Sequence, residues 1–168
     1  MNIEDSPSEK LNFISEKSSN RSVRIRFVPG TQFTDFEKRI PKIIEYALAK
    51  REKDKRKIYL DFTCCFEDKW ELICKTLAQY IDQLPKIDVL DVQHSDFPLA
   101  ALNQLYLIYS KCENMENLPI IIIDDTFAHE EADRIFIQCR IEQKGKDFLE
   151  KLCFPENKWF VTPPNYEN

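Results

Sequence analysis

Residues 84–105 of the chain read LPKIDVLDVQHSDFPLAALNQL. The apolar residues within 87–92 are typical of a β-strand. Apolar residues from Leu102 onwards then recur at helical spacing, and Pro98 suits the first turn of a helix. This stretch therefore predicts one strand that is followed by one helix.

The same strand–helix unit recurs before and after this stretch. The four predicted strands are centred on Ile25, Leu60, Leu90 and Ile121, so that successive strands lie about 30–35 residues apart. Strands that alternate with helices indicate a parallel sheet with right-handed crossovers. We therefore predict an α/β fold with a mainly parallel sheet of repeated β-α units. Two arrangements are consistent with it: a compact three-layer sheet, which the all-apolar strand at 120–123 favours, and a short solenoid.

The chain divides into two parts by composition. Residues 1–21 are polar and lack a regular apolar pattern, apart from a small apolar group around Phe13. We predict a flexible N-terminal arm over 1–21 and a single α/β domain over 22–168, with residues 159–161 as a candidate fifth strand.

The unit at 84–105 resembles a leucine-rich repeat of the ribonuclease-inhibitor type. Ile87, Leu90 and Val92 occupy the apolar positions of the L-x-x-L-x-L pattern, and Ser95 lies where that family prefers Asn or Cys. The resemblance extends over residues 22–145 and implies an open parallel sheet suited to protein recognition. The residues that it would expose on that sheet are Arg24, Arg26, Tyr59, Asp61, Asp91 and Asp124.

Composition excludes several classes of function. The formal net charge is -5, which argues against a general nucleic-acid-binding protein. The two glycines cannot form a glycine-rich phosphate loop, and six cysteines without a C-x-x-C pair do not form a zinc site of known spacing. We expect no cofactor and no membrane insertion, since no apolar run approaches the roughly 20 residues of a spanning helix.

The expected location of the protein is a cytosol, either of its own cell or of a host cell. Residues 1–21 contain no apolar segment of the signal-peptide type. The cysteines are then expected to be reduced, because disulfides are rare in that compartment.

A catalytic alternative depends on the carboxyl ends of the strands, where ligands bind in open parallel sheets. Cys64 or Cys65 could act there as a nucleophile, with His94 as its base and Asp124 as the group that orients the histidine. Asp124 and Asp125 could instead hold a metal ion such as Mg²⁺. Against this, Asp125 also suits the cap of the next helix, and polar residues gather at this edge of any parallel sheet.

The sequence thus favours a non-catalytic module that binds another protein of unknown identity. Its predicted binding residues are Arg24, Arg26, Tyr59, Asp61 and Asp91. The alternative is a small hydrolase or transferase with the cysteine nucleophile or the metal site at the carboxyl edge of the sheet.

Overall fold

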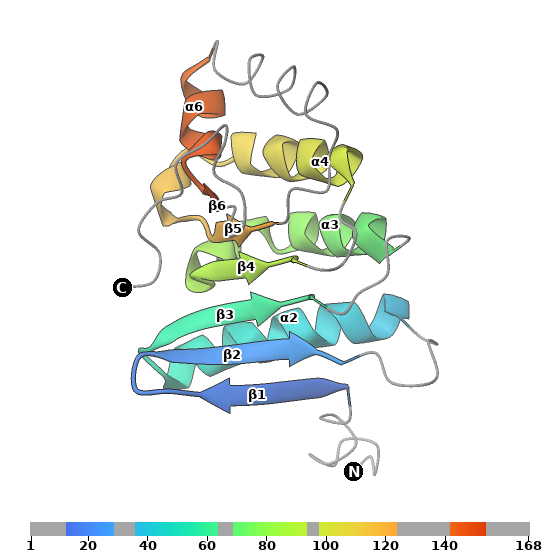
Figure 1. Cartoon of the computed structure of the whole chain (residues 1–168), viewed down its shortest axis with the longest axis vertical. Coiled ribbons are helices and arrows are strands. Elements are labelled where there is room, and N and C mark those ends of the chain that lie inside the picture. The colour runs from blue at the N-terminus through green and yellow to red at the C-terminus, as the bar shows by residue number, and fades with distance from the viewer. Residues whose placement is uncertain (1–12, 29–35, 64–68, 94–97, 124–141, 154–168) are drawn as a thin grey trace.

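The computed structural model describes residues 13–28, 36–63, 69–93, 98–123 and 142–153. They form one six-stranded sheet and several helices (Figure 1). The strands are β1 (Ile14–Ser18), β2 (Ser22–Phe27), β3 (Lys57–Asp61), β4 (Val89–Asp91), β5 (Ile120–Ile122) and β6 (Leu152–Cys153). The α-helices are α2 (Phe36–Lys53), α3 (Trp70–Gln79), α4 (Leu99–Ser110) and α6 (Gln143–Leu149), and the 3-10 helices are η3 (Ile81–Lys86) and η4 (Met115–Asn117).

The strands lie in the sheet in the order in which they occur in the chain. β2 to β6 are parallel to their neighbours, and β1 is antiparallel to β2. The predicted α/β fold with a mainly parallel sheet is therefore confirmed. The candidate strand at 159–161 lies outside the described residues, and the strand that follows β5 is β6, which pairs with it in parallel.

β1 lies within the segment that the sequence assigns to the N-terminal arm. It pairs with β2 from Ile14 opposite Phe27 to Ser18 opposite Val23. Phe13, which precedes β1, is buried against Phe27 with 6.2 Å between the ring centroids. The sheet thus begins before residue 22, because the buried Phe13 side chain and the antiparallel backbone pairing over Ile14–Ser18 tie this polar strand to β2.

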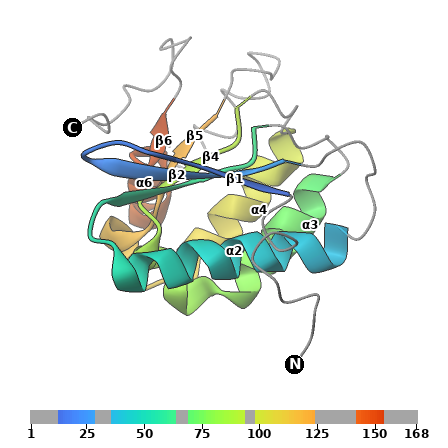
Figure 2. The ribbon, with the colours of Figure 1, turned by 90° about the horizontal axis from the view of Figure 1, so that it is seen from below.

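The described helices cover one face of the sheet. Figure 2 shows α2, α3, α4 and α6 on the same side. Side chains of these helices share a single hydrophobic core with the side chains that the strands point towards them, such as Ile25, Leu60, Leu90 and Ile121. The described residues therefore form two layers, and they do not contain the second helical layer of the three-layer arrangement.

The longest helix shows why this face is buried. Ile40, Ile43, Ile44 and Ala47 recur at the spacing that places them on one side of α2, and none of them is exposed. At the end of the helix Arg51 donates hydrogen bonds to the carbonyl oxygens of Lys86 (2.7 Å) and Arg56 (3.2 Å) and contacts the Asp88 carboxylate. These contacts fix the end of α2 against the starts of β3 and β4.

No helix in the described ranges combines the length and apolar character that crossing a lipid bilayer requires.

Candidate functional site

The face of the sheet opposite the helices is here called the helix-free face, because none of the described helices lies on it (Figure 2). Side chains alternate between the two faces of a strand, and the pairing register identifies those on this face. They are Ser15, Lys17, Ser22, Arg24, Arg26, Lys57, Tyr59, Asp61, Val89, Asp91, Ile120, Ile122 and Cys153. All five residues that the sequence predicts as partner-binding lie on this face.

Four charged side chains form a cluster on three adjacent strands of this face. Arg24 Nη1 donates to Asp61 Oδ2 at 2.8 Å and to Asp91 Oδ2 at 2.9 Å. Arg26 Nε lies 3.3 Å from the same oxygen of Asp61. The Asp61 side chain is 0% exposed and that of Asp91 3%, whereas Arg24 is 36% and Arg26 45% exposed. Two buried carboxylates thus hold two arginines that remain accessible to solvent.

The ends of β3 and β4 satisfy the remaining oxygens of the two carboxylates. The backbone N–H of Thr63 donates to Asp61 Oδ1 at 2.8 Å, and the backbone N–H of Gln93 donates to Asp91 Oδ1 at 3.1 Å. The Gln93 side chain donates to the same oxygen of Asp91, also at 3.1 Å. Both strands end in the same local turn, in which the aspartate accepts from the backbone two residues further on.

These contacts determine the ionisation of the cluster. Burial alone would raise the pKa of Asp61, but hydrogen bonds from Thr63 and Arg24 hold it below its ordinary value. Burial would likewise lower the pKa of Arg24, and its hydrogen bonds to Asp91 and Asp61 raise it instead. Both partners are therefore charged at neutral pH. Arg24 Cζ also lies 4.8 Å from the centroid of the Tyr59 ring, a cation–π contact that orients the guanidinium.

A solvent-open hollow lies beside the cluster. Its described lining consists of Ser15 and Lys17 from β1 and Arg24 and Arg26 from β2. Three of these four side chains are cations, and no acidic side chain of the described residues lines the hollow. A negatively charged group is the ligand that this arrangement favours.

The other half of the helix-free face is apolar. Val89, Ile122 and Cys153 are buried and form a small second cluster, against which Tyr59 and Ile120 pack. The face therefore has an apolar half over β4, β5 and β6 and a cationic half over β1 and β2. Because the apolar side chains are buried, the accessible half is the cationic one.

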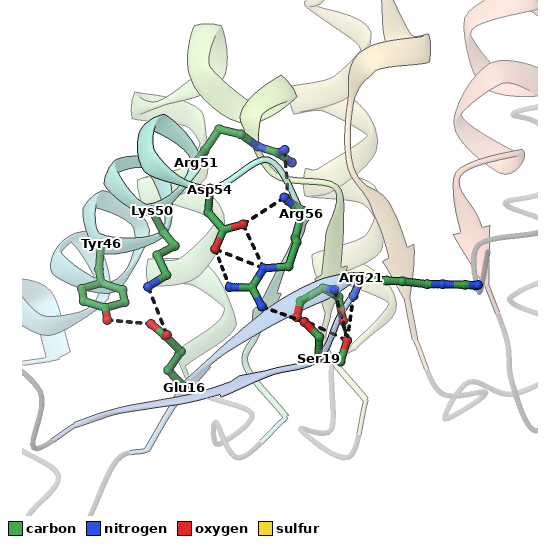
Figure 3. Close-up of polar contacts among 9 residues, drawn as sticks. Glu16, Ser19, Arg21, Tyr46, Lys50, Arg51, Asp54 and Arg56 are labelled. Carbon is green, nitrogen blue, oxygen red and sulfur yellow. Dashed lines mark hydrogen bonds and ion pairs between the residues drawn. The ribbon is translucent and has the colours of Figure 1, made fainter.

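β1 is fixed to α2 by polar contacts on the other side of the sheet (Figure 3). Glu16 accepts a hydrogen bond from the Tyr46 hydroxyl at 2.7 Å and pairs with Lys50 at 3.1 Å. The β1–β2 turn is held by Arg56, which donates to the carbonyl oxygen of Ser19 at 2.7 Å. In Figure 3 the side chain of Arg21, at this turn, extends away from these contacts. The strand that supplies Ser15 and Lys17 thus has a defined position.

This attachment of β1 can be tested by titration. Burial and the hydrogen bond to Glu16 raise the pKa of Tyr46 to about 12. We expect Tyr46→Phe to leave the absorbance change at 295 nm unchanged up to about pH 10.5, because ordinary phenols ionise near pH 10 and Tyr46 does not. Glu16→Gln should bring part of the Tyr46 ionisation into this range, because it removes the negative charge of Glu16 but leaves the hydroxyl buried. Since the folded chain retains a proton that the unfolded chain loses, this tyrosine makes the fold less stable as the pH rises above about 10.

Circular dichroism across the same pH range shows that each variant remains folded during the titration. If Tyr46→Phe removed one tyrosine's absorbance change near pH 10, the contact with Glu16 would be absent.

The residues of the predicted catalytic and metal sites lie outside the described residues. They are Cys64, Cys65, His94, Asp124 and Asp125. The strands β3, β4 and β5 that lead to them run in the same direction. Among the described residues, no group of three His, Cys, Asp or Glu side chains could hold a metal ion, and burial raises the pKa of the free Cys74 thiol to about 12.

Four residues of the site were missed at the level of sequence. Thr63 and Gln93 fix the two carboxylates, and Ser15 and Lys17 complete the hollow. The spacing of Asp61 to Thr63 equals that of Asp91 to Gln93, and this repeated pattern at two strand ends was the available signal. Ser15 and Lys17 lie in the segment that resembled a flexible arm, so no pattern identified them.

Comparisons of the chain with protein-family models, with curated proteins and with solved structures gave no match.

Proposed function

We propose that this chain is a non-catalytic protein-interaction module that binds another protein through its helix-free face. The observation that supports this most directly is the pair of exposed guanidinium groups, Arg24 and Arg26, over the buried carboxylates Asp61 and Asp91. Arginine is enriched among the residues that dominate binding energy at protein interfaces. Side chains that are already held in place lose less conformational entropy on binding.

A protein fits this face better than a nucleic acid does. The cationic half contains three cations at its hollow, and two buried carboxylates lie beside them. The chain as a whole has a formal net charge of -5. Binding to a nucleic acid generally requires a larger basic surface that neutralises several phosphates.

A cytosolic location is part of the proposal. Cys74 and Cys112 are free thiols, and this state is typical of a reducing compartment. A hydrolase or transferase at the carboxyl edge of the sheet is the alternative, and no contact among the described residues favours it.

Site-specific photocrosslinking tests the proposed face. Benzoylphenylalanine in place of Ser15 would lie in the hollow without removing a charge, and the same residue in place of Ala78 would lie on the exposed side of α3. We expect ultraviolet light to produce a discrete adduct in a cell extract from position 15 and not from position 78. Mass spectrometry then identifies the bound protein.

The adduct must also depend on the cationic half of the face. We expect Arg26→Ala to reduce its yield several-fold, because the change removes an exposed guanidinium and leaves the buried core intact. Identical adducts from positions 15 and 78, or an adduct at position 15 that does not respond to Arg26→Ala, would contradict the proposal.

A further inference from the structure

We infer that the partner presents an extended acidic segment, with carboxylate side chains at alternate positions, which lies along β2 over the hollow. This inference rests on the proposed function and specifies the chemistry of the partner.

The spacing of the cations on the face is the first argument. Arg24 and Arg26 are two residues apart on β2, and Lys17 of β1 lies directly opposite Arg24. Residues two apart on a strand are separated by about 7 Å, and their side chains point to the same side. An extended segment with an acidic residue at every second position repeats its carboxylates at the same interval. The spacing of the cations along the sheet therefore equals the spacing of the carboxylates along such a segment.

The second argument concerns which cations can accept a ligand. Arg24 is engaged by both Asp61 and Asp91. Among the described residues, the one polar contact of the Arg26 side chain runs from Nε to Asp61 at 3.3 Å, and its two Nη groups have no hydrogen-bond partner there. A guanidinium binds a carboxylate best through two parallel N–H groups. Arg26 is therefore the principal ligand-binding group, and Arg24 acts mainly by positioning.

Lys17 provides a second accessible cation in the same hollow. It is exposed on β1, and no acidic side chain of the described residues lies within ion-pair distance of it. Two carboxylates of one segment can thus contact Arg26 and Lys17, because Lys17 lies opposite Arg24, two residues before Arg26.

The basic surface continues to the β1–β2 turn. A second open hollow lies there, and its lining contains Asn20, Arg21, Lys55 and Lys57 together with Asp54 and Arg56, which pair with each other. Lys57 is aligned with Ser22, two residues before Arg24 in β2. The acidic segment therefore extends over about three side-chain positions of β2, those of Arg26, Arg24 and Ser22. This length corresponds to roughly five residues in an extended conformation.

Fluorescence anisotropy with two labelled decapeptides tests this inference. One peptide has four glutamates at alternate positions with serines between them, and the other has the same composition with the four glutamates in succession. We expect the alternating peptide to bind the full chain about fivefold more tightly at low salt, since all its carboxylates can face one side. Added salt should weaken binding of both peptides.

Matched charge reversals identify the binding surface. Arg26→Glu and Lys17→Glu should each weaken binding of the alternating peptide about tenfold. Lys75→Glu, which makes the same change of net charge on the exposed side of α3, should leave it nearly unchanged. Equal affinities of the two peptides, or equal effects of Arg26→Glu and Lys75→Glu, would overturn the inference.

A ten-nucleotide single strand of DNA forms the third arm. If it bound as tightly as the alternating peptide and with the same dependence on Arg26, the surface would be a general polyanion site and the inference would fail. Failure of the proposed function has a different result, which is that no adduct at position 15 depends on Arg26. An adduct at position 15 that needs Arg26, together with no binding of either peptide, would keep the interaction module and reject the acidic segment.

Discussion

Arg24→Met is expected to lower the free energy of unfolding by about 2–3 kcal/mol at pH 7. The substitution leaves Asp61 and Asp91 buried without the cation that bridges them. Removing one partner of a buried ion pair typically costs about 3–5 kcal/mol, and we expect less here because Arg24 is partly exposed and Arg26 still contacts Asp61. Urea denaturation followed by tryptophan fluorescence gives the value.

Two further variants show whether the loss comes from the cluster. Lys75→Met removes the same charge from the exposed side of α3 and should change the stability by less than about 0.5 kcal/mol. Combining Arg24→Met with Asp61→Asn and Asp91→Asn should restore part of the loss, because it removes the unpaired charges. An effect of Arg24→Met no larger than that of Lys75→Met would show that the cluster does not stabilise the fold.

The same variant should also change the dependence of stability on pH. In the native chain the pKa of Asp61 is lowered. The stability that this carboxylate adds to the fold is therefore fully present above the ordinary aspartate pKa of about 3.9, and it is lost as the pH falls through the lower pKa of the folded state. Without Arg24, the Asp61 carboxylate loses one of the contacts that lower its pKa, and only Thr63 and Arg26 still oppose the effect of burial. The difference between the two proteins should therefore persist from neutral pH down to about pH 4 and shrink as the pH falls further, through the lowered pKa of Asp61.

Phe27→Ala is expected to have a still larger effect on stability. Phe27 is fully buried at the end of β2, and the centroids of Phe13 and Phe62 each lie 6.2 Å from that of its ring. Removing a buried phenylalanine ring costs about 3–5 kcal/mol through lost burial and the cavity that remains. Denaturant unfolding should show a loss of about 4 kcal/mol, in the range typical of such truncations.

Phe27→Leu serves as the control for this substitution. It keeps most of the apolar volume and should cost only about 1–1.5 kcal/mol. Because Phe13 packs on Phe27, hydrogen exchange in β1 should accelerate more in the alanine variant than exchange in β4. A loss below about 1 kcal/mol for Phe27→Ala would show that this aromatic contact is not part of the rigid core.

Much of the fold follows from local patterns in the sequence. Alternation of strands and helices predicts the parallel sheet, and the period of two within β2 places Arg24 and Arg26 on the same face. β1 could not be found in this way, because its sequence ISEKS has a single apolar residue and the strand is defined by pairing with β2. The apolar run at 120–123 suggests helices on both sides, yet Ile122 is buried without a described helix over it.

The chemistry of the site was less predictable than its residues. Asp61 and Asp91 are 30 positions apart in the chain, and only the register of β3 with β4 places them side by side. That Arg24 bridges both carboxylates is a consequence of this register and of side-chain geometry. Sequence patterns identify which face a residue lies on, but not which of its neighbours it binds.

The chain-order arrangement of the strands has a consequence for how the molecule assembles. Among the described strands, each pairs with its neighbours in chain order alone, so that none of these pairings joins positions more than about 35 residues apart. Each parallel pairing closes a crossover of about 30–35 residues, and no pairing of the described strands depends on a more distant part of the chain. Structure can therefore spread from one nucleus towards either edge, and another β-α unit could be added beyond β6 without rearranging the strands already in place.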